Sequence, residues 1–485
     1  MKLIDRQAKH SGVAVMLLTV LAAIMFAGVI APAQAQTFTS LYSFQGTSGN
    51  IGAYPQGLVQ GIDGNLYGVT HAGGDQFSSG TFFKISTSGT EKTLCSFFDT
   101  GACRNVQAPA ANLTLGKNGS FYGVDVLGDI FQLNAHGKLK VLYTNGNNIP
   151  RAALVLASNG YFYGTTVNGG ANNQGTVFKM SAAGKVTTLY SFCSVFQNSV
   201  CQDGAQPSFA LVQGSDGNLY GTTAVGGNDG VNAGYGTIFK ITLAGSLTTI
   251  YNFPGFTQSS SALVAGADGN LYGTTFGGGS GKFGPGGTFF TITSAGALTT
   301  LYNFCTQQNC TDGAGPSNIF LAADGNYYGI TWNGGANSQG TAFQLSPSGR
   351  LNTLHSFNGA DGSGPNGGGT LMQDTSGTLF GTMQEGGPGW PNCSSCDGTI
   401  FSLDMGLSPF VETLPTSGKV KAAVKILGTN LTGATSVTFN GTEAIFKVVS
   451  SSEITTKVPV GATSGLVQVV TPTRTFSSNV TFQVP

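Results

Sequence analysis

Three aspartates stand in the same short frame, Asp-Gly-x-x-Pro, within long segments that separate repeated phrases. They are Asp203, Asp312 and Asp361. A glycosidase needs two carboxylates on opposite sides of a sugar at a set separation, so these residues are candidates for ligand-binding or catalytic chemistry. An aspartate before Gly also stabilises a tight turn, which is the simpler interpretation. The sequence leaves both interpretations open, because it does not determine how far apart the carboxylates lie.

The histidines are weaker candidates for catalytic or metal-binding chemistry. After residue 35 the chain contains His71, His136 and His355, which occupy different parts of the repeated phrases. Side chains so placed are not expected to converge on one general base or one metal ion. We therefore predict a protein without a metal site or cofactor, and we predict that it is not an enzyme.

Aromatic residues are the better candidates for ligand binding. Trp332, Trp390, Tyr235 and Phe283 lie in or beside variable segments of the repeats. Flat apolar rings on a surface with few charges suit stacking on sugars or anchoring a protein partner. Packing of these rings against neighbouring loops is the alternative, and the sequence does not decide between the two.

These residues are carried by a phrase that occurs seven times, with Leu211–Thr223 and Leu263–Thr275 as its fullest copies. A glycine after an aromatic residue marks each copy, at intervals of 55, 41, 57, 52, 56 and 52 residues. A period of this length, built from short β-type runs, is typical of propeller blades. The marker glycines are Gly68, Gly123, Gly164, Gly221, Gly273, Gly329 and Gly381.

Each copy predicts four strands in an antiparallel meander. In the fourth copy they are Ala210–Val212, Asn218–Thr223, Thr237–Ile241 and Leu247–Phe253. An Asp-Gly or Asn-Gly turn joins the first two runs in most copies, and another glycine turn joins the last two. The remaining connections are long and variable. We expect them to emerge together on one face, called the long-loop face, and the tight turns on the opposite, short-turn face.

The ends of the array predict a closed ring of seven blades. The seventh copy stops after its third run at Leu403, and Thr39–Phe44 supplies a spare fourth run. A strand from the start of the chain that completes the last sheet leaves no exposed sheet edge.

The repeated phrase resembles a known family. Leu-Val-Gln-x-x-Asp-Gly-Asn-Leu-Tyr-Gly-Thr-Thr, then Gly-Thr-x-Phe-Lys-Ile and Thr-Thr-Leu-Tyr-Ser-Phe, is similar to the GloVer tandem repeat of exported bacterial proteins, over residues 37–403. More remotely, the repeat resembles kelch propeller blades. The resemblance implies a surface or secreted location and no established reaction.

The composition changes after Gly406. Residues 408–485 contain no Cys, His, Trp or Tyr and form short alternating β runs. Phrases such as Val437-Thr-Phe-Asn-Gly441 and Val458-Pro-Val-Gly-Ala462 resemble the IPT/TIG domain, which implies a spacer, adhesion or interaction module. A propeller with such a tail is also similar to galactose oxidase, but the copper site of that family needs a tail histidine, and this tail has none.

The predicted fold is therefore all-β. It is a seven-bladed β-propeller of four-stranded blades closed by the N-terminal strand, followed by an immunoglobulin-like β-sandwich. The predicted boundaries are 1–35 for a signal peptide, 36–406 for the propeller and 407–485 for the IPT/TIG domain.

The N-terminus and the cysteines both predict export. A basic start, an apolar run and Ala33-Gln34-Ala35 form a signal-peptide pattern, with an uncleaved membrane anchor as the alternative. Close cysteine pairs are expected as local disulfides in an oxidising compartment. Zinc is the alternative for the last pair, which has a C-x-x-C spacing. The pairs are Cys95 with Cys103, Cys193 with Cys201, Cys305 with Cys310, and Cys393 with Cys396.

Charged residues make up only 9% of the chain and the formal net charge is +0, which argues against nucleic-acid partners. No membrane span is expected in the mature chain. We predict a secreted or cell-surface binding or adhesion protein that recognises a glycan or a surface protein through the long-loop face. The alternative function is an extracellular carbohydrate-active enzyme, a hydrolase or lyase, that uses loop carboxylates. The sequence gives no oligomeric state.

Overall fold

The computed structural model describes residues 36–45, 52–74, 78–98, 103–144, 150–227, 234–254, 263–364, 369–392 and 397–485. The chain divides into two compact units, Met1–Gln36 and Thr37–Pro485, and all elements below belong to the second. The predicted signal peptide lies outside the described residues, so it stays a prediction. In the described part of the chain, no helix is both long and apolar enough to cross a membrane.

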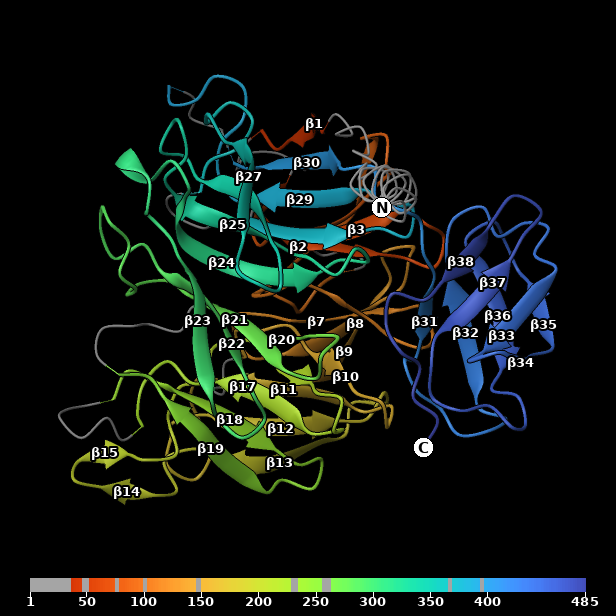
Figure 1. The fold of residues 1–485 in the computed structure, drawn as a ribbon, viewed down its shortest axis with the longest axis horizontal. Coiled ribbons are helices and arrows are strands. Elements are labelled where there is room, and N and C mark those ends of the chain that lie inside the picture. The colour runs from red at the N-terminus through yellow and green to blue at the C-terminus, as the bar shows by residue number, and fades with distance from the viewer. Residues whose placement is uncertain are drawn as a thin grey trace, which may run out of the picture. The chain divides into compact units, whose positions relative to one another are not determined.

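The repeats fold into four-stranded antiparallel sheets, each a meander in chain order, which gives an all-β, propeller-like fold (Figure 1). The first three sheets are β2 (Gly52–Gln60), β3 (Leu66–Gly73), β4 (Thr81–Ile85) and β5 (Glu91–Ser96); β6 (Thr114–Leu115), β7 (Phe121–Val124), β8 (Ile130–Leu133) and β9 (Leu139–Tyr143); and β10 (Val155–Leu156), β11 (Phe162–Thr166), β12 (Thr176–Met180) and β13 (Val186–Ser191).

The next three sheets repeat the arrangement. They are β16 (Val212–Gln213), β17 (Leu219–Thr222), β18 (Thr237–Ile241) and β19 (Leu247–Asn252); β20 (Val264–Ala265), β21 (Leu271–Thr275), β22 (Thr288–Ile292) and β23 (Leu298–Asn303); and β24 (Ala314–Leu321), β25 (Tyr327–Asn333), β26 (Thr341–Leu345) and β27 (Leu351–Ser356). A hairpin of β14 (Phe196–Gln197) and β15 (Val200–Cys201) and a short 3-10 turn, Gln308–Cys310, lie in two of the long loops.

The last sheet takes its fourth strand from the start of the chain, as the sequence predicts. β28 (Gly369–Gln373), β29 (Leu379–Met383) and β30 (Thr399–Asp404) form three strands, and β1 (Thr37–Ser43) pairs antiparallel with β30. Figure 1 shows β1 beside β30.

The marker glycine is explained by the aromatic residue opposite it on the third strand. Gly221 pairs with Phe239 across β17 and β18, and a Cβ at Gly221 would lie 2.6 Å from the Phe239 ring. The same Gly–Phe pairing recurs in the other sheets, for example between Gly329 and Phe343. Since the ring occupies the place of a side chain, only glycine leaves room for it.

The Asp-Gly turn is held by its own aspartate. The Asp216 carboxylate accepts hydrogen bonds from the Asn218 amide and the Tyr220 hydroxyl, and it pairs with Lys240 at 2.8 Å. Gly217 adopts φ of 79°, which glycine tolerates best. The repeated Asp-Gly-Asn motif therefore builds the hairpin.

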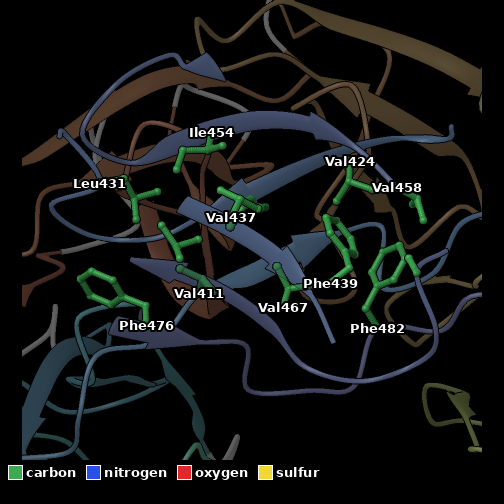
Figure 2. Close-up of a cluster of buried hydrophobic side chains, with 13 residues drawn as sticks. Val411, Val424, Leu431, Val437, Phe439, Ile454, Val458, Val467, Phe476 and Phe482 are labelled. Atoms are coloured by element: carbon green, nitrogen blue, oxygen red, sulfur yellow. The ribbon is translucent and has the colours of Figure 1, made fainter. Parts of the chain in front are cut away.

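The C-terminal residues form two further sheets that face each other. One contains β31 (Glu412–Leu414), β32 (Ala423–Leu427), β36 (Glu453–Lys457) and β35 (Phe446–Val448); the other contains β34 (Thr442–Glu443), β33 (Ser436–Phe439), β37 (Val467–Val470) and β38 (Thr475–Ser477). Their shared core includes Val424, Ile454, Phe439 and Phe482, each at most 2% exposed (Figure 2).

This sandwich contacts the short-turn face of the repeats. The Ser452 hydroxyl donates to the Ile62 carbonyl at 2.8 Å, and the Ser417 hydroxyl donates to the Ser158 carbonyl at 3.0 Å. Ile62 and Ser158 both lie in turns between the first and second strands of their sheets. The long-loop face is not involved in these contacts.

Candidate functional site

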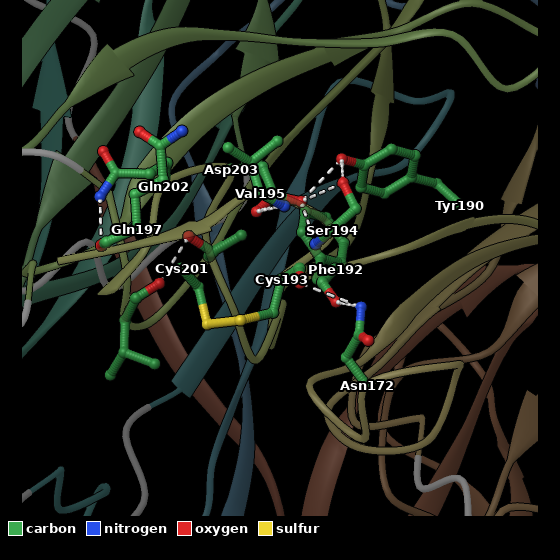
Figure 3. The surroundings of a disulfide bond; sticks show 12 residues. Asn172, Tyr190, Phe192, Cys193, Ser194, Val195, Gln197, Cys201, Gln202 and Asp203 are labelled. Atoms are coloured by element: carbon green, nitrogen blue, oxygen red, sulfur yellow. Dashed lines mark hydrogen bonds between the residues drawn. A yellow bond between two sulfur atoms is a disulfide. The ribbon is translucent and has the colours of Figure 1, made fainter. Parts of the chain in front are cut away.

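The loop aspartates are held by their own loops. Asp203 is 5% exposed, and its carboxylate accepts hydrogen bonds from the Tyr190 hydroxyl at 2.6 Å and from the Ser194 and Val195 amides (Figure 3). Burial, then the hydrogen bond to Asp203, raises the pKa of Tyr190 to about 12. This geometry is that of a loop-stabilising carboxylate.

The equivalent aspartates of other repeats behave alike. Asp312 is fully buried and accepts from the Tyr302 hydroxyl at 2.7 Å and the Thr306 amide at 2.9 Å. Asp361 lies 2.9 Å from the His355 Nε2 and accepts from the Asn358 amide. These three carboxylates stabilise separate loops, and none of them lines the cavity described below. The turn interpretation therefore fits their contacts better than the catalytic one.

Disulfides lie in the loops of Asp203 and Asp312 and in the corresponding loop of the first repeat. Cys95–Cys103, Cys193–Cys201 and Cys305–Cys310 are bonded as the sequence predicts. Figure 3 shows the second of these beside Asp203. Cys393 and Cys396 lie outside the described residues, so their pairing stays a prediction.

The aromatic candidates do not meet at one place. Trp332 lines a cavity and packs edge-to-face on Phe276 at 5.0 Å between ring centroids. The Trp390 indole lies against Gly359, where it would clash with any added Cβ. Tyr235 packs partly buried beside the core of its sheet. Phe283 is 47% exposed, under the ammonium of Lys282. Trp332 alone of the four lines the cavity.

The cavity has a volume of about 400 Å³ and lies where the first strands of six sheets come together. We call it the axial cavity. It sits at the long-loop end of those strands, because its lining residues begin the first strands or end the second. They are Pro55, Gln56, Ala110, Ala111, Asn112, Arg151, Ala152, Ala153, Ser208, Phe209, Ala210, Phe276, Ser317, Asn318, Ile319, Trp332, Gly369, Thr370, Leu371, Thr382 and Gln384.

The lining combines polar groups with aromatic rings. Amides come from Gln56, Asn112, Asn318 and Gln384. Among these described lining residues, Arg151 has the single charged side chain. Concave sites with a few polar groups on an otherwise apolar wall are the usual form of small-ligand sites.

A second group of titratable side chains lies beside this cavity. The Tyr54 amide donates to the Asp397 carbonyl at 2.7 Å, and the next residue, Pro55, lines the cavity. Asp397 is 7% exposed, and its Oδ2 has no hydrogen-bond partner among the described residues. Burial raises the pKa of the Asp397 carboxyl, and the nearby Tyr54 hydroxyl acts in the opposite direction. Burial, Asp397 and Glu385 all raise the pKa of Tyr54.

Sequence reasoning missed Arg151, the cavity amides and Asp397. A signal was present for the first two kinds, because the residue types differ from copy to copy. Gln56, Asn112, Arg151 and Asn318 lie in or shortly before the first strands of their repeats, and Gln384 follows the second strand, β29. Positions at which the residue type differs from one repeat to the next are not needed to form the strands, so they are candidates for ligand binding.

The fold and its axial cavity define a class, the propeller-like repeat proteins with a C-terminal immunoglobulin-like domain. The model of the Gloeobacter/Verrucomicrobia repeat matches residues 29–227, 125–261 and 228–443, and the IPT/TIG model matches 409–484. The chain belongs to the Gloeobacter/Verrucomicrobia repeat family and carries an IPT/TIG domain. No curated protein has a sequence that matches it.

Several solved structures are similar in fold. Virginiamycin B lyase from Staphylococcus aureus has a TM-score of 0.51 and 18% identity, covering 76% of this chain and 99% of that chain. A fungal alcohol oxidase of the AA5 family, in complex with copper, has a TM-score of 0.51 and 13% identity, covering 92% of this chain and 99% of that chain. At these identities the likeness shows the fold alone.

These structures correct one prediction. The expectation that the protein is not an enzyme is wrong as a conclusion from the fold, because virginiamycin B lyase and the fungal alcohol oxidase are enzymes with a similar fold. Among the described residues, no three His, Cys, Asp or Glu side chains are grouped in a way that could hold a metal ion.

Proposed function

We propose that the protein is an exported carbohydrate-active enzyme that binds its substrate in the axial cavity at the long-loop face. The observation that carries the proposal is the cavity itself, which joins amide groups, Arg151 and the Trp332 ring in one concave site. Amides hydrogen-bond sugar hydroxyls, and an indole ring offers an apolar surface for a sugar face. The three disulfides support export, since such bonds persist in oxidising compartments.

The same proposal includes a closed ring of seven blades, residues 36–406, with the sandwich at 407–485. Three observations support closure. β1 completes the sheet of β28–β30, β2 lies against both β28 and β6, and the Thr375 amide donates to the Gln60 side chain at 3.0 Å. A closed ring holds the first strands at a fixed spacing, which shapes the cavity.

The candidate for the catalytic acid in this proposal is Asp397, which lies behind Pro55 of the cavity wall and is not itself one of the described lining residues. A carboxyl group whose pKa is raised by burial holds a proton at higher pH than usual and can give it to a leaving glycosidic oxygen. Glu385 follows Gln384 of the cavity wall and is the second carboxylate near Tyr54. Hydrolysis would break the glycosidic C–O bond, with the Asp397 proton going to the leaving oxygen, while a water molecule adds to the sugar carbon and gives one proton to the Glu385 carboxylate.

The test combines binding with turnover. Purified protein is screened on a glycan array, and the sugars that bind are assayed for release of reducing ends. Trp332→Ala should weaken binding by roughly 1–3 kcal/mol, and Asp397→Asn should abolish turnover while binding remains. Trp390→Ala is the matched control, because Trp390 shares this face but does not line the cavity. Binding without any turnover would reject the enzyme, and binding unaffected by Trp332→Ala would reject the cavity as the site.

A further inference from the structure

We propose that the axial cavity selects acidic sugars, and that Arg151 binds the carboxylate of a uronic acid unit. This inference rests on the proposed function and names the substrate class of the same cavity.

Arg151 is placed as a binding residue. It begins the third repeat's first run, just before β10, and lines the cavity with its neighbours Ala152 and Ala153. Its side chain is exposed, while Ala152 is buried. Among the described residues no carboxylate lies within ion-pair distance of its guanidinium, and no side-chain hydrogen bond engages it. An unpaired guanidinium offers five donors in a planar fork that matches a carboxylate.

The rest of the lining favours a single negative charge. No aspartate or glutamate belongs to the wall among the described lining residues, so a bound anion meets no repulsion from it. A phosphate carries close to two charges and is usually met by several cations, whereas a uronate carries one. The amide of Asn112 in the same wall can hydrogen-bond a sugar hydroxyl. One guanidinium with neutral polar neighbours therefore matches a uronic acid better than a phosphorylated sugar.

The experiment compares sugars that differ only in charge. An array presents oligosaccharides of glucuronate, galacturonate and mannuronate beside their neutral counterparts and sulfated forms. Wild type, Arg151→Gln, Arg151→Lys and the control Arg350→Gln are compared on it. Arg350 is an exposed arginine in the turn before β27, outside the cavity lining, so its loss changes net charge equally without touching the site.

Wild type should prefer at least one uronate over its neutral counterpart by about ten- to hundred-fold, as expected for a charge-assisted hydrogen-bonded pair. Arg151→Gln should remove that preference, so that the uronate binds no more tightly than its neutral counterpart. Arg151→Lys should keep only part of it, since lysine lacks the fork. Arg350→Gln should behave as wild type.

Four outcomes overturn the inference. Neutral sugars bound as tightly as uronates would reject acidic selectivity and leave the proposed function standing. A preference that survives Arg151→Gln would reject Arg151 as its cause. Sulfated sugars preferred over uronates would reject the carboxylate assignment. Failure of every sugar to bind would reject the proposed function, and this inference with it.

Discussion

Replacing the marker glycine Gly221 with alanine tests the packing that defines each repeat. Gly221 has no positive φ, so the backbone alone permits alanine there. An alanine at a compatible site normally stabilises a protein by about 0.4–1 kcal/mol, through the entropy of the unfolded chain. In this structure the new Cβ would lie 2.6 Å from the Phe239 ring and 2.7 Å from the Leu211 methyl. Such overpacking costs about 1–3 kcal/mol, so the sign of the effect should reverse.

Two further variants separate the clash at Gly221 from a general cost of replacing glycine. Gly217→Ala in the neighbouring turn meets nothing within 4 Å but requires φ of 79°, so it should cost only about 1 kcal/mol. Phe239→Leu should relieve part of the clash, and the double variant Gly221→Ala with Phe239→Leu should be less destabilised than the two single costs added. Thermal unfolding followed by circular dichroism gives the ranking. Gly221→Ala that unfolds at or above the wild-type temperature would refute the reasoning.

Three other measurements test the fold. Deletion of residues 37–44 should expose β30 as an edge strand and remove the buried Phe44, so the melting temperature should fall or the protein should aggregate; unchanged melting and solubility would contradict closure. Mass spectrometry of non-reduced digests should recover the three described disulfides and a Cys393–Cys396 peptide, and free thiols at Cys193 and Cys201 would contradict the structure. Burial raises the pKa of Glu412 to about 7, so the folded protein keeps this proton to higher pH than the unfolded chain does, and its stability falls as pH rises toward 7. Glu412→Gln should therefore flatten the dependence of the unfolding free energy on pH. A pH profile that Glu412→Gln leaves unaltered would assign the dependence to other groups.

The fold was predictable because its signals are local. Asp216-Gly217-Asn218 specifies a hairpin through contacts within a few residues, and the repeat supplies the same information seven times. The end strand was predictable because the seventh copy lacks a run that Thr39–Phe44 matches.

The site was not predictable, because it depends on contacts between distant residues. Arg151, Asn318 and Gln384 share one wall only once the sheets are arranged side by side. The sequence leaves open whether Asp203 is a catalytic acid or a turn residue, and the structure shows its carboxylate accepting hydrogen bonds from Tyr190 and two loop amides. Asp397 follows the cysteine pair that the sequence predicts as a disulfide or a zinc site. The pKa of its carboxyl is raised by burial, and the spacing of residues in the sequence does not indicate which side chains are buried.

The pairing of β1 with β30 also sets an order of events during folding. Thr37 pairs with Asp404, so the first strand of the folded chain to be synthesised finds its partner only after every repeat has been made. Contacts so distant in sequence form late, since the chain between them must be ordered first. Until then β1 is an unpaired strand, and β30, which pairs with β29 on its other side, is an exposed sheet edge of the kind on which chains associate wrongly. Since β1 stays unpaired until β30 has been synthesised, it is the strand with the longest time in which to pair with another chain. A chaperone that binds β1 during this interval would reduce aggregation at that step of folding.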